Sequence, residues 1–102
     1  MIEEIRRKIE LAEYEYSLHA ADQSTLRRIA RTEIEEAFQN GVVIEDYPSD
    51  KYGPSCLVLA YTKAGRPLHI QCTHPVRVRI KIITVYEPDA GEWIEFNKRN
   101  QK

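Results

Sequence analysis

The spacing of apolar residues changes once along this chain, at Asn40-Gly41, and this change constrains the fold more than any other feature. Before it, apolar residues recur three or four positions apart, as in amphipathic helices. After it, they alternate with polar residues, as in strands. Helices first and strands second predict an α+β fold. With 102 residues there is room for one hydrophobic core, so we expect a single domain over residues 1–102.

Three helices are expected in the first part of the chain. Apolar residues at helical spacing mark the first helix, over residues 2–13. Ser17 can cap a short second helix. Thr32 and Glu35 have the spacing of a capping box for a third helix, and Asn40-Gly41 is a strong signal for its end.

Four strands are expected after the helices. They cover residues 42–47, 55–62, 68–72 and 76–86. Short, turn-rich connections separate them, so we expect a four-stranded antiparallel sheet with the N-terminal helices packed on it. After the last strand, an otherwise polar tail contains three large apolar residues, Trp93, Ile94 and Phe96. This tail either docks on the domain or serves as a binding segment for a partner.

The last expected strand carries three cations on one face. Alternation places one set of side chains on one side, Val76, Val78, Ile80 and Ile82, and a second set on the other, Arg77, Arg79 and Lys81. The formal net charge is -1, so attraction to a polyanion has to come from such local clustering. The row is either the solvated outer face of the sheet or a surface that tracks phosphates. Nearby cations and rings that suit single-stranded RNA are Lys63, Arg66, His69, Tyr52 and Tyr86.

Several other chemistries are not expected. The three histidines lack the short spacings of zinc sites, and the scattered glycines form no phosphate-binding loop, so we expect no metal and no cofactor. Cys56 and Cys72 are expected to be reduced and buried in strands. No apolar run approaches the ~20 residues that span a bilayer, and the N-terminus is acidic, so we expect a cytoplasmic protein without a membrane partner.

What remains is acid-base chemistry by His, Tyr, Arg and Lys, the minimum set for metal-free RNA cleavage by the substrate's own 2′-hydroxyl. This reaction needs a base, an acid and cations for the charged phosphorane. The catalytic candidates are His19, Arg27, His69, Lys81 and Tyr86, and the RNA-binding candidates are Arg66, Arg77 and Arg79. For each histidine the alternative is a structural hydrogen-bonding role.

Several short segments together resemble a bacterial family of small proteins with a domain of unknown function. They include Tyr16-Ser17-Leu18-His19-Ala20, Gly65-Arg66-Pro67-Leu68-His69 and Ile83-Thr84-Val85-Tyr86-Glu87-Pro88. The resemblance covers about residues 14–93, and the helix over 1–13 and the tail over 94–102 fall outside it. This family is placed near RelE-like and MqsR-like toxins and is often encoded beside YgiT-type zinc-finger proteins. The resemblance implies a RelE-like toxin fold, ribonuclease activity and a YgiT-type zinc-finger antitoxin as partner.

One departure from the family pattern bears on activity. Members usually carry an arginine four residues after the histidine of the His-Ala pair and another four residues later, whereas this chain has Gln23 and Arg27.

Two hypotheses for the function compete. The first is the toxin of a type II toxin-antitoxin system, a metal-independent endoribonuclease acting on mRNA, free or on the ribosome. The second is a catalytically inactive RelE-like fold that binds RNA or protein. A third class, a small-molecule enzyme, would need a concave apolar pocket.

Overall fold

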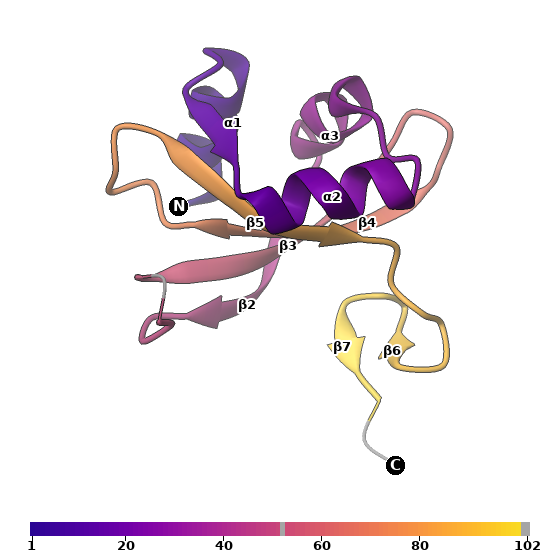
Figure 1. Cartoon of the computed structure of the whole chain (residues 1–102). Coiled ribbons are helices and arrows are strands. Elements are labelled where there is room, and N and C mark those ends of the chain that lie inside the picture. Colours follow the sequence, from indigo (N-terminus) through magenta and orange to yellow (C-terminus); the bar gives the residue numbers. More distant parts are fainter. Residues whose placement is uncertain (52, 101–102) are drawn as a thin grey trace.

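The computed structural model describes residues 1–51 and 53–100. Within them the chain forms helices and strands in the following order (Figure 1): α1 (Ile2–Glu10), β1 (Tyr14–Tyr16), α2 (Leu18–Leu26), α3 (Arg31–Phe38), β2 (Val42–Tyr47), β3 (Ser55–Tyr61), β4 (Pro67–Thr73), β5 (Ile80–Tyr86), β6 (Trp93–Ile94) and β7 (Lys98–Arg99). The α+β class is confirmed. None of the helices among the described residues is long and apolar enough to cross a membrane.

The main sheet is mixed and has five strands, in the order β1-β5-β4-β3-β2. β2, β3, β4 and β5 pair antiparallel, whereas β1 pairs in parallel with β5, from Tyr14 opposite Ile80 to Tyr16 opposite Ile82. The expectation of a four-stranded antiparallel sheet is therefore wrong by one strand. β1 has only three residues, too few for a clear periodic signal, and it depends on its long-range pairing with β5.

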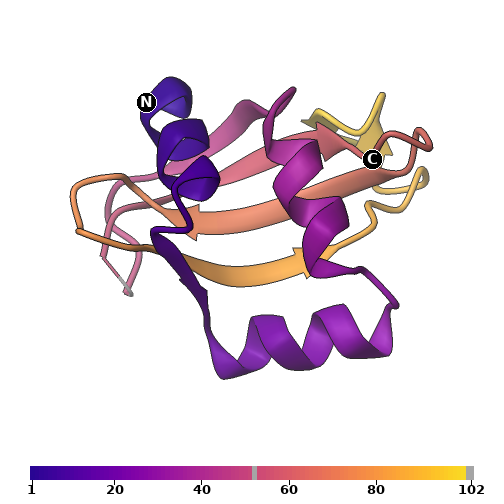
Figure 2. The same cartoon turned by 90° about the horizontal axis from the view of Figure 1, so that it is seen from above.

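The helices lie on one face of the sheet (Figure 1), and α2 runs beside β5 at the sheet edge (Figure 2). α1 buries Ile5 and Ile9, and α3 buries Ile34, Ala37 and Phe38. These side chains pack against the apolar face of β3, β4 and β5. α2 contributes only Ala20 to the core, and Ser17 ties it to β5 instead: its backbone N–H and its hydroxyl donate to the carbonyls of Ile82 and Ile83.

The expected burial of the two cysteines is confirmed. Cys56 in β3 and Cys72 in β4 are directly opposite each other in the antiparallel ladder, and both side chains are fully buried as free thiols. They behave as small core residues on the helix-covered face.

The strand expected over residues 76–86 begins only at Ile80. Val76 and Val78 are 80% and 79% exposed, so the apolar face expected from the alternation is wrong at these two positions. The segment before Ile80 is a loop because no strand among the described residues pairs with it: β4 ends at Thr73, and Lys8 of α1 donates to the carbonyl of Val78. The alternation of apolar and charged residues therefore begins at Val76, before the residues that pair as β5.

Two helix boundaries also differ from expectation. α1 ends at Glu10 rather than at residue 13, and Ala12 adopts a left-handed backbone with φ 58°. α3 begins at Arg31 rather than Thr32, because the side chain of Glu33 accepts a hydrogen bond from the backbone N–H of Ala30. The first turn is thus capped by Glu33 and not by the expected Thr32 pair.

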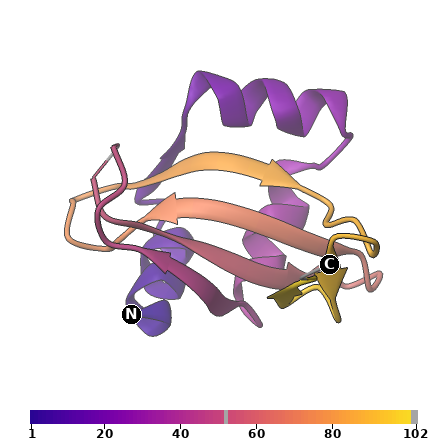
Figure 3. The same ribbon diagram turned by 90° about the horizontal axis from the view of Figure 1, so that it is seen from below.

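The C-terminal tail docks on its own domain. Residues 93–99 form a small hairpin, β6–β7, that lies on the sheet face opposite the helices (Figures 1 and 3). Trp93 is buried there, Phe96 is half-buried and Ile94 is exposed. Trp93 therefore packs against the sheet rather than against the helices.

Candidate functional site

Three of the five catalytic candidates come together at one end of the sheet. Arg27 is the C-cap residue that follows α2, and His69 lies in β4. Tyr86, at the end of β5, is directly opposite His69 in the antiparallel ladder. The guanidinium carbon of Arg27 lies 5.9 Å from the centroid of the Tyr86 ring. The hydroxyl oxygen of Tyr86 lies 3.1 Å from Nδ1 of His69. We call this set the Tyr86 cluster.

His69 is the buried member of the Tyr86 cluster. Its side chain is fully enclosed, with Nε2 2.6 Å from the carbonyl oxygen of Phe96 and the Trp93 ring 4.4 Å away. Burial lowers the pKa of His69 below its ordinary value of 6.5, because the charged imidazolium loses its hydration. In this conformation His69 cannot contact RNA, and a role in catalysis has to act through Tyr86.

Tyr86 and Arg27 are the accessible members. Tyr86 is half-buried, and this burial raises the pKa of its hydroxyl, which therefore carries its proton at neutral pH. Arg27 is exposed, and its positive charge lies over the face of the Tyr86 ring. A phenol that is hydrogen-bonded to an imidazole and lies beside a guanidinium can transfer a proton next to a bound phosphate.

Three residues that the sequence analysis did not select hold the hairpin beside this cluster. Arg99 donates two hydrogen bonds to the carboxylate of Glu45, at 2.8 and 3.0 Å, and its guanidinium carbon lies 4.8 Å from the Trp93 ring. Tyr47 donates a hydrogen bond to the same carboxylate. Arg99 lowers the pKa of Glu45, whereas burial and the neighbouring carboxylate raise the pKa of Tyr47 to about 12. No local pattern identifies these residues, because Glu45 and Arg99 are 54 positions apart.

The other two catalytic candidates lie at the opposite end of α2. His19 in the first turn of α2 and Lys81 in β5 line a hollow of about 120 Å³ together with Ser17 and Ile83. His19 is exposed, and the ammonium group of Lys81 makes no ion pair within residues 1–51 and 53–100. Eight residues of helix separate His19 from Arg27, or ~12 Å at 1.5 Å per residue. The five candidates thus form two groups along one boundary, not one constellation.

Arg66 has a clear structural role. Its guanidinium forms ion pairs with Glu33 and Glu87 and donates to the backbone carbonyls of Arg27 and Arg28, at 2.8 and 2.9 Å. These contacts satisfy the two carbonyls that follow α2 and fix the backbone that carries the Arg27 side chain. The guanidinium of Arg66 is thus turned toward the protein. An RNA contact by Arg66 stays a prediction.

The expected basic row is not a strand face. Arg77 and Arg79 are exposed in the loop before β5, and only Lys81 lies in the strand. Arg79 is nevertheless two residues from Lys81, so it extends the charge at the His19 end of α2. Lys63 faces Glu36 at 3.9 Å, and Tyr52, expected to offer a stacking surface, lies outside the described residues.

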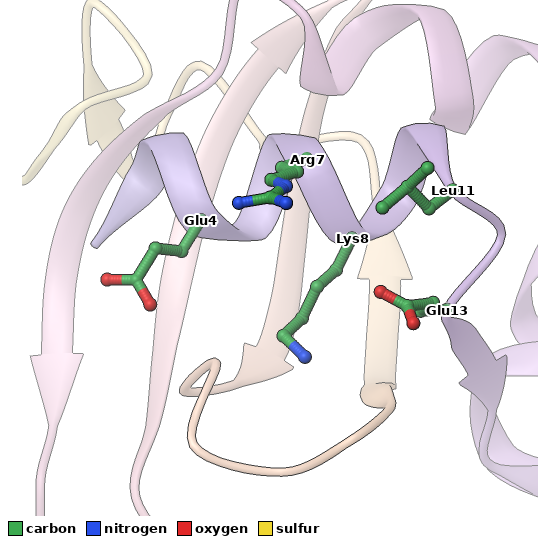
Figure 4. Close-up of a pocket in the computed structure, with 5 residues that line it drawn as sticks. All are labelled: Glu4, Arg7, Lys8, Leu11 and Glu13. Carbon is green, nitrogen blue, oxygen red and sulfur yellow. The ribbon is translucent and has the colours of Figure 1, made fainter.

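A further hollow, of about 320 Å³, lies on the outer side of α1 (Figure 4). Its lining mixes acidic and basic side chains, Glu4, Arg7, Lys8, Leu11 and Glu13. The Lys8 ammonium points away from α1 and donates to the Val78 carbonyl, so this hollow presents no converging reactive groups. Within the part of the chain that the structure describes, no group of three His, Cys, Asp or Glu residues is placed to hold a metal ion.

Comparison with known proteins gives one match. Residues 16–87 match the family model of a domain of unknown function, DUF4258. The match includes His19, Arg27, His69, Lys81 and Tyr86 and ends before the C-terminal hairpin. No curated protein and no solved structure matches the chain.

Proposed function

The chain belongs to the DUF4258 family, and we propose that it is the toxin of a type II toxin-antitoxin system, a metal-independent endoribonuclease that acts on mRNA from a RelE-like fold. The observation that carries this proposal is the placement of Arg27 over the ring of Tyr86, whose hydroxyl is held by His69. A proton-transfer group and a cation within reach of one phosphate are the main requirements of RNA cleavage without a metal.

In the proposed reaction, the 2′-oxygen of the substrate attacks the adjacent phosphorus and the bond from phosphorus to the 5′-oxygen breaks. The Tyr86 hydroxyl oxygen accepts the 2′ proton while its own proton passes to Nδ1 of His69, and solvent water protonates the leaving 5′-oxygen. Arg27 stabilises the additional negative charge on the phosphorane. The products are a 2′,3′-cyclic phosphate and a 5′-hydroxyl, and the proton on Nδ1 of His69 returns through the Tyr86 hydroxyl to the hydroxide left in the solvent.

His19 and Lys81 bind the neighbouring part of the RNA in this proposal. His19 lies ~12 Å from Arg27 along the helix, so in this proposal His19 and Lys81 contact a different part of the RNA from Arg27. The charges of Lys81 and Arg79 would hold the backbone of a single strand that runs beside α2, and the His19 ring would contact it there.

The second candidate function is an RNA-binding or protein-binding module without catalysis, and Gln23 favours it. His19, Gln23 and Arg27 are spaced by four residues and therefore share one side of α2. His19 and Arg27 both lie beside β5 residues, so Gln23 interrupts a basic row on that side. If the module is correct, Gln23→Arg should tighten RNA binding without any cleavage; if the toxin proposal is correct, it should increase cleavage.

A direct test uses purified protein in EDTA with a single-stranded RNA. Cleavage should leave a 2′,3′-cyclic phosphate, and the same sequence with 2′-O-methyl groups should stay intact because it lacks the attacking nucleophile. Binding to both RNAs with cleavage of neither would support the module. Cleavage of the 2′-O-methyl RNA would point to a contaminating or different nuclease and reject the mechanism.

The proposed partner is a YgiT-type zinc-finger antitoxin. Because Trp93 is buried within its own chain, the docked tail does not offer this side chain to a partner. α2 offers other apolar contacts, since Leu18 and Leu26 are 87% and 76% exposed beside the two groups of candidates. Purification of the chain after co-expression with the adjacent reading frame should recover that partner together with its zinc. The double variant Leu18→Ser, Leu26→Ser should abolish recovery of the partner. The control variant Leu11→Ser, at an exposed leucine after α1, should still recover it. Recovery of the wild-type chain alone, without zinc, would reject the partner.

A further inference from the structure

His69 has a defined hydrogen-bond partner on each ring nitrogen. Nδ1 lies 3.1 Å from the Tyr86 hydroxyl oxygen, and Nε2 lies 2.6 Å from the Phe96 carbonyl oxygen. The side chain is fully buried, so water does not compete for either nitrogen. The two partners therefore decide which nitrogen carries the proton.

The Phe96 carbonyl determines the tautomer. A carbonyl oxygen can only accept a hydrogen bond, so Nε2 must donate and must carry a hydrogen. The buried ring is neutral near pH 7 because burial lowers its pKa, and a neutral imidazole has one N–H only. Nδ1 is then an acceptor, and the Tyr86 hydroxyl must donate to it. The Phe96 carbonyl, on one side of the His69 ring, therefore determines the direction of the Tyr86 O–H bond on the other side of that ring.

That carbonyl belongs to the C-terminal hairpin, and two contacts keep the hairpin in place. The Trp93 ring packs edge to face on the His69 ring at an interplanar angle of 89°. Arg99 binds Glu45 of β2 through two hydrogen bonds. The Phe96 carbonyl is thus held at the end of a short, doubly anchored segment.

We infer that the C-terminal hairpin fixes His69 as its Nε2–H tautomer, and that His69 in turn orients the hydroxyl of Tyr86. His69 is therefore a positioning residue that does not touch the RNA. Its importance for cleavage rests on the proposed function, whereas the tautomer and the hydrogen bond do not.

The tautomer can be measured by NMR on uniformly ¹⁵N-labelled protein, with long-range ¹H–¹⁵N correlations assigned by His19→Gln and His74→Gln. The expected result for His69 is a protonated Nε2 and an unprotonated Nδ1, with an Nε2 hydrogen that exchanges slowly with water. Trp93→Ala should accelerate that exchange and allow the two tautomers to average. Ile94→Ala, at an exposed position of the same hairpin, should change neither property.

Two results would overturn the inference. One is an Nδ1–H tautomer in the wild type. The other is an unchanged His69 spectrum and exchange rate when the hairpin is loosened. If Trp93→Ala does not fold, Arg99→Gln loosens the hairpin from the surface and serves the same comparison.

Replacement of His69 separates its two hydrogen bonds. In His69→Asn the shorter side chain can still offer a carboxamide oxygen to the Tyr86 hydroxyl but cannot reach Phe96. In His69→Gln the amide nitrogen can still reach Phe96, but the acceptor for Tyr86 is displaced. We expect kcat to fall ~10-fold more in the Gln variant than in the Asn variant, with KM unchanged, as for loss of one hydrogen bond. The reverse order would contradict the positioning role.

The proposed ribonuclease function and the proposed His69 tautomer can be rejected independently. If the wild type cleaves no RNA but His69 has the expected tautomer, the proposed function is wrong and the positioning device stands. If the wild type cleaves RNA but His69 has the other tautomer, the device is wrong and the proposed function stands.

Discussion

The indole ring of Trp93 and the imidazole ring of His69 meet edge to face, with their centroids 4.4 Å apart. This contact joins the last hairpin, outside the family match, to a strand inside it. Because Trp93 is the only tryptophan in the chain, its fluorescence reports whether the hairpin is docked. The same signal can therefore follow several of the predictions below.

Acidification should weaken the fold through His69. The folded state holds His69 neutral with a pKa below 6.5, whereas the unfolded chain protonates it near 6.5. Below pH ~6.5 the unfolded state binds more protons, so the free energy of unfolding should fall as pH drops toward the folded pKa. Above pH 6.5 this contribution is fully present. The groups that face the ring, Tyr86, Glu45 and Arg99, remain in their neutral pH charge states over this window.

The measurement is urea denaturation at pH 7.5 and pH 5.5, followed by Trp93 fluorescence. His69→Gln removes the titrating group, so its stability should change less between the two pH values than that of the wild type. An equal change in both proteins would show that His69 does not cause the acid sensitivity.

The ion pair between Glu45 and Arg99 should stabilise the hairpin modestly. Arg99 is largely exposed, so solvent screening limits the pair to ~1 kcal/mol or less. Glu45→Gln and Arg99→Gln should each red-shift the Trp93 emission, and the double variant should lose less than the sum of the single losses. Additive losses in this double-mutant cycle would mean that the two side chains do not interact in solution.

Arg66→Ala should destabilise the domain more than Lys63→Ala. Arg66 binds two carboxylates and two carbonyls at the end of α2, so its loss should cost ~2 kcal/mol, whereas the exposed pair of Lys63 with Glu36 should contribute little. Thermal unfolding followed by circular dichroism measures both. Equal melting temperatures for the two variants would remove the structural role of Arg66.

Arg79 and Lys81 should contribute to RNA affinity through phosphate contacts. For single-stranded RNA, each contact contributes ~0.7 to the slope of log K against log salt concentration, so the double alanine variant should lose ~1.4 from the slope. Lys98→Ala, in the hairpin, provides the control. A slope that matches the wild type would identify these cations as solvated surface only.

The fold class was predictable because a single change of hydrophobic period separates helices from strands. β1 was not, since Tyr14, Glu15 and Tyr16 become a strand only by pairing with β5. The last strand was predicted too long, so Arg77 and Arg79 were placed in it beside Lys81. Alternation of apolar and polar residues does not show where the neighbouring strand ends. The candidates His69 and Tyr86 were selected from residue type, but only the strand register makes them neighbours.

The enclosure of His69 could not be predicted from the sequence. It depends on Phe96, 27 positions away, and on an ion pair between Glu45 and Arg99 that spans 54 positions. Helical spacing does place His19 and Arg27 on one side of α2, but the length of the helix, ~12 Å between them, divides the catalytic candidates into two groups. Residue types indicated the chemistry, and tertiary distances decided which groups can act together.

The most direct test of the proposed chemistry is the single-turnover rate of RNA cleavage in EDTA by Tyr86→Phe. This variant keeps the ring beneath Arg27 and removes only the hydroxyl that His69 holds. We expect a rate lowered by ~10²-fold or more, as for loss of a general acid-base group. Tyr61→Phe, at an exposed tyrosine of β3, should cleave at the wild-type rate. A Tyr86→Phe protein that cleaves as fast as the wild type would exclude the Tyr86 hydroxyl from the reaction.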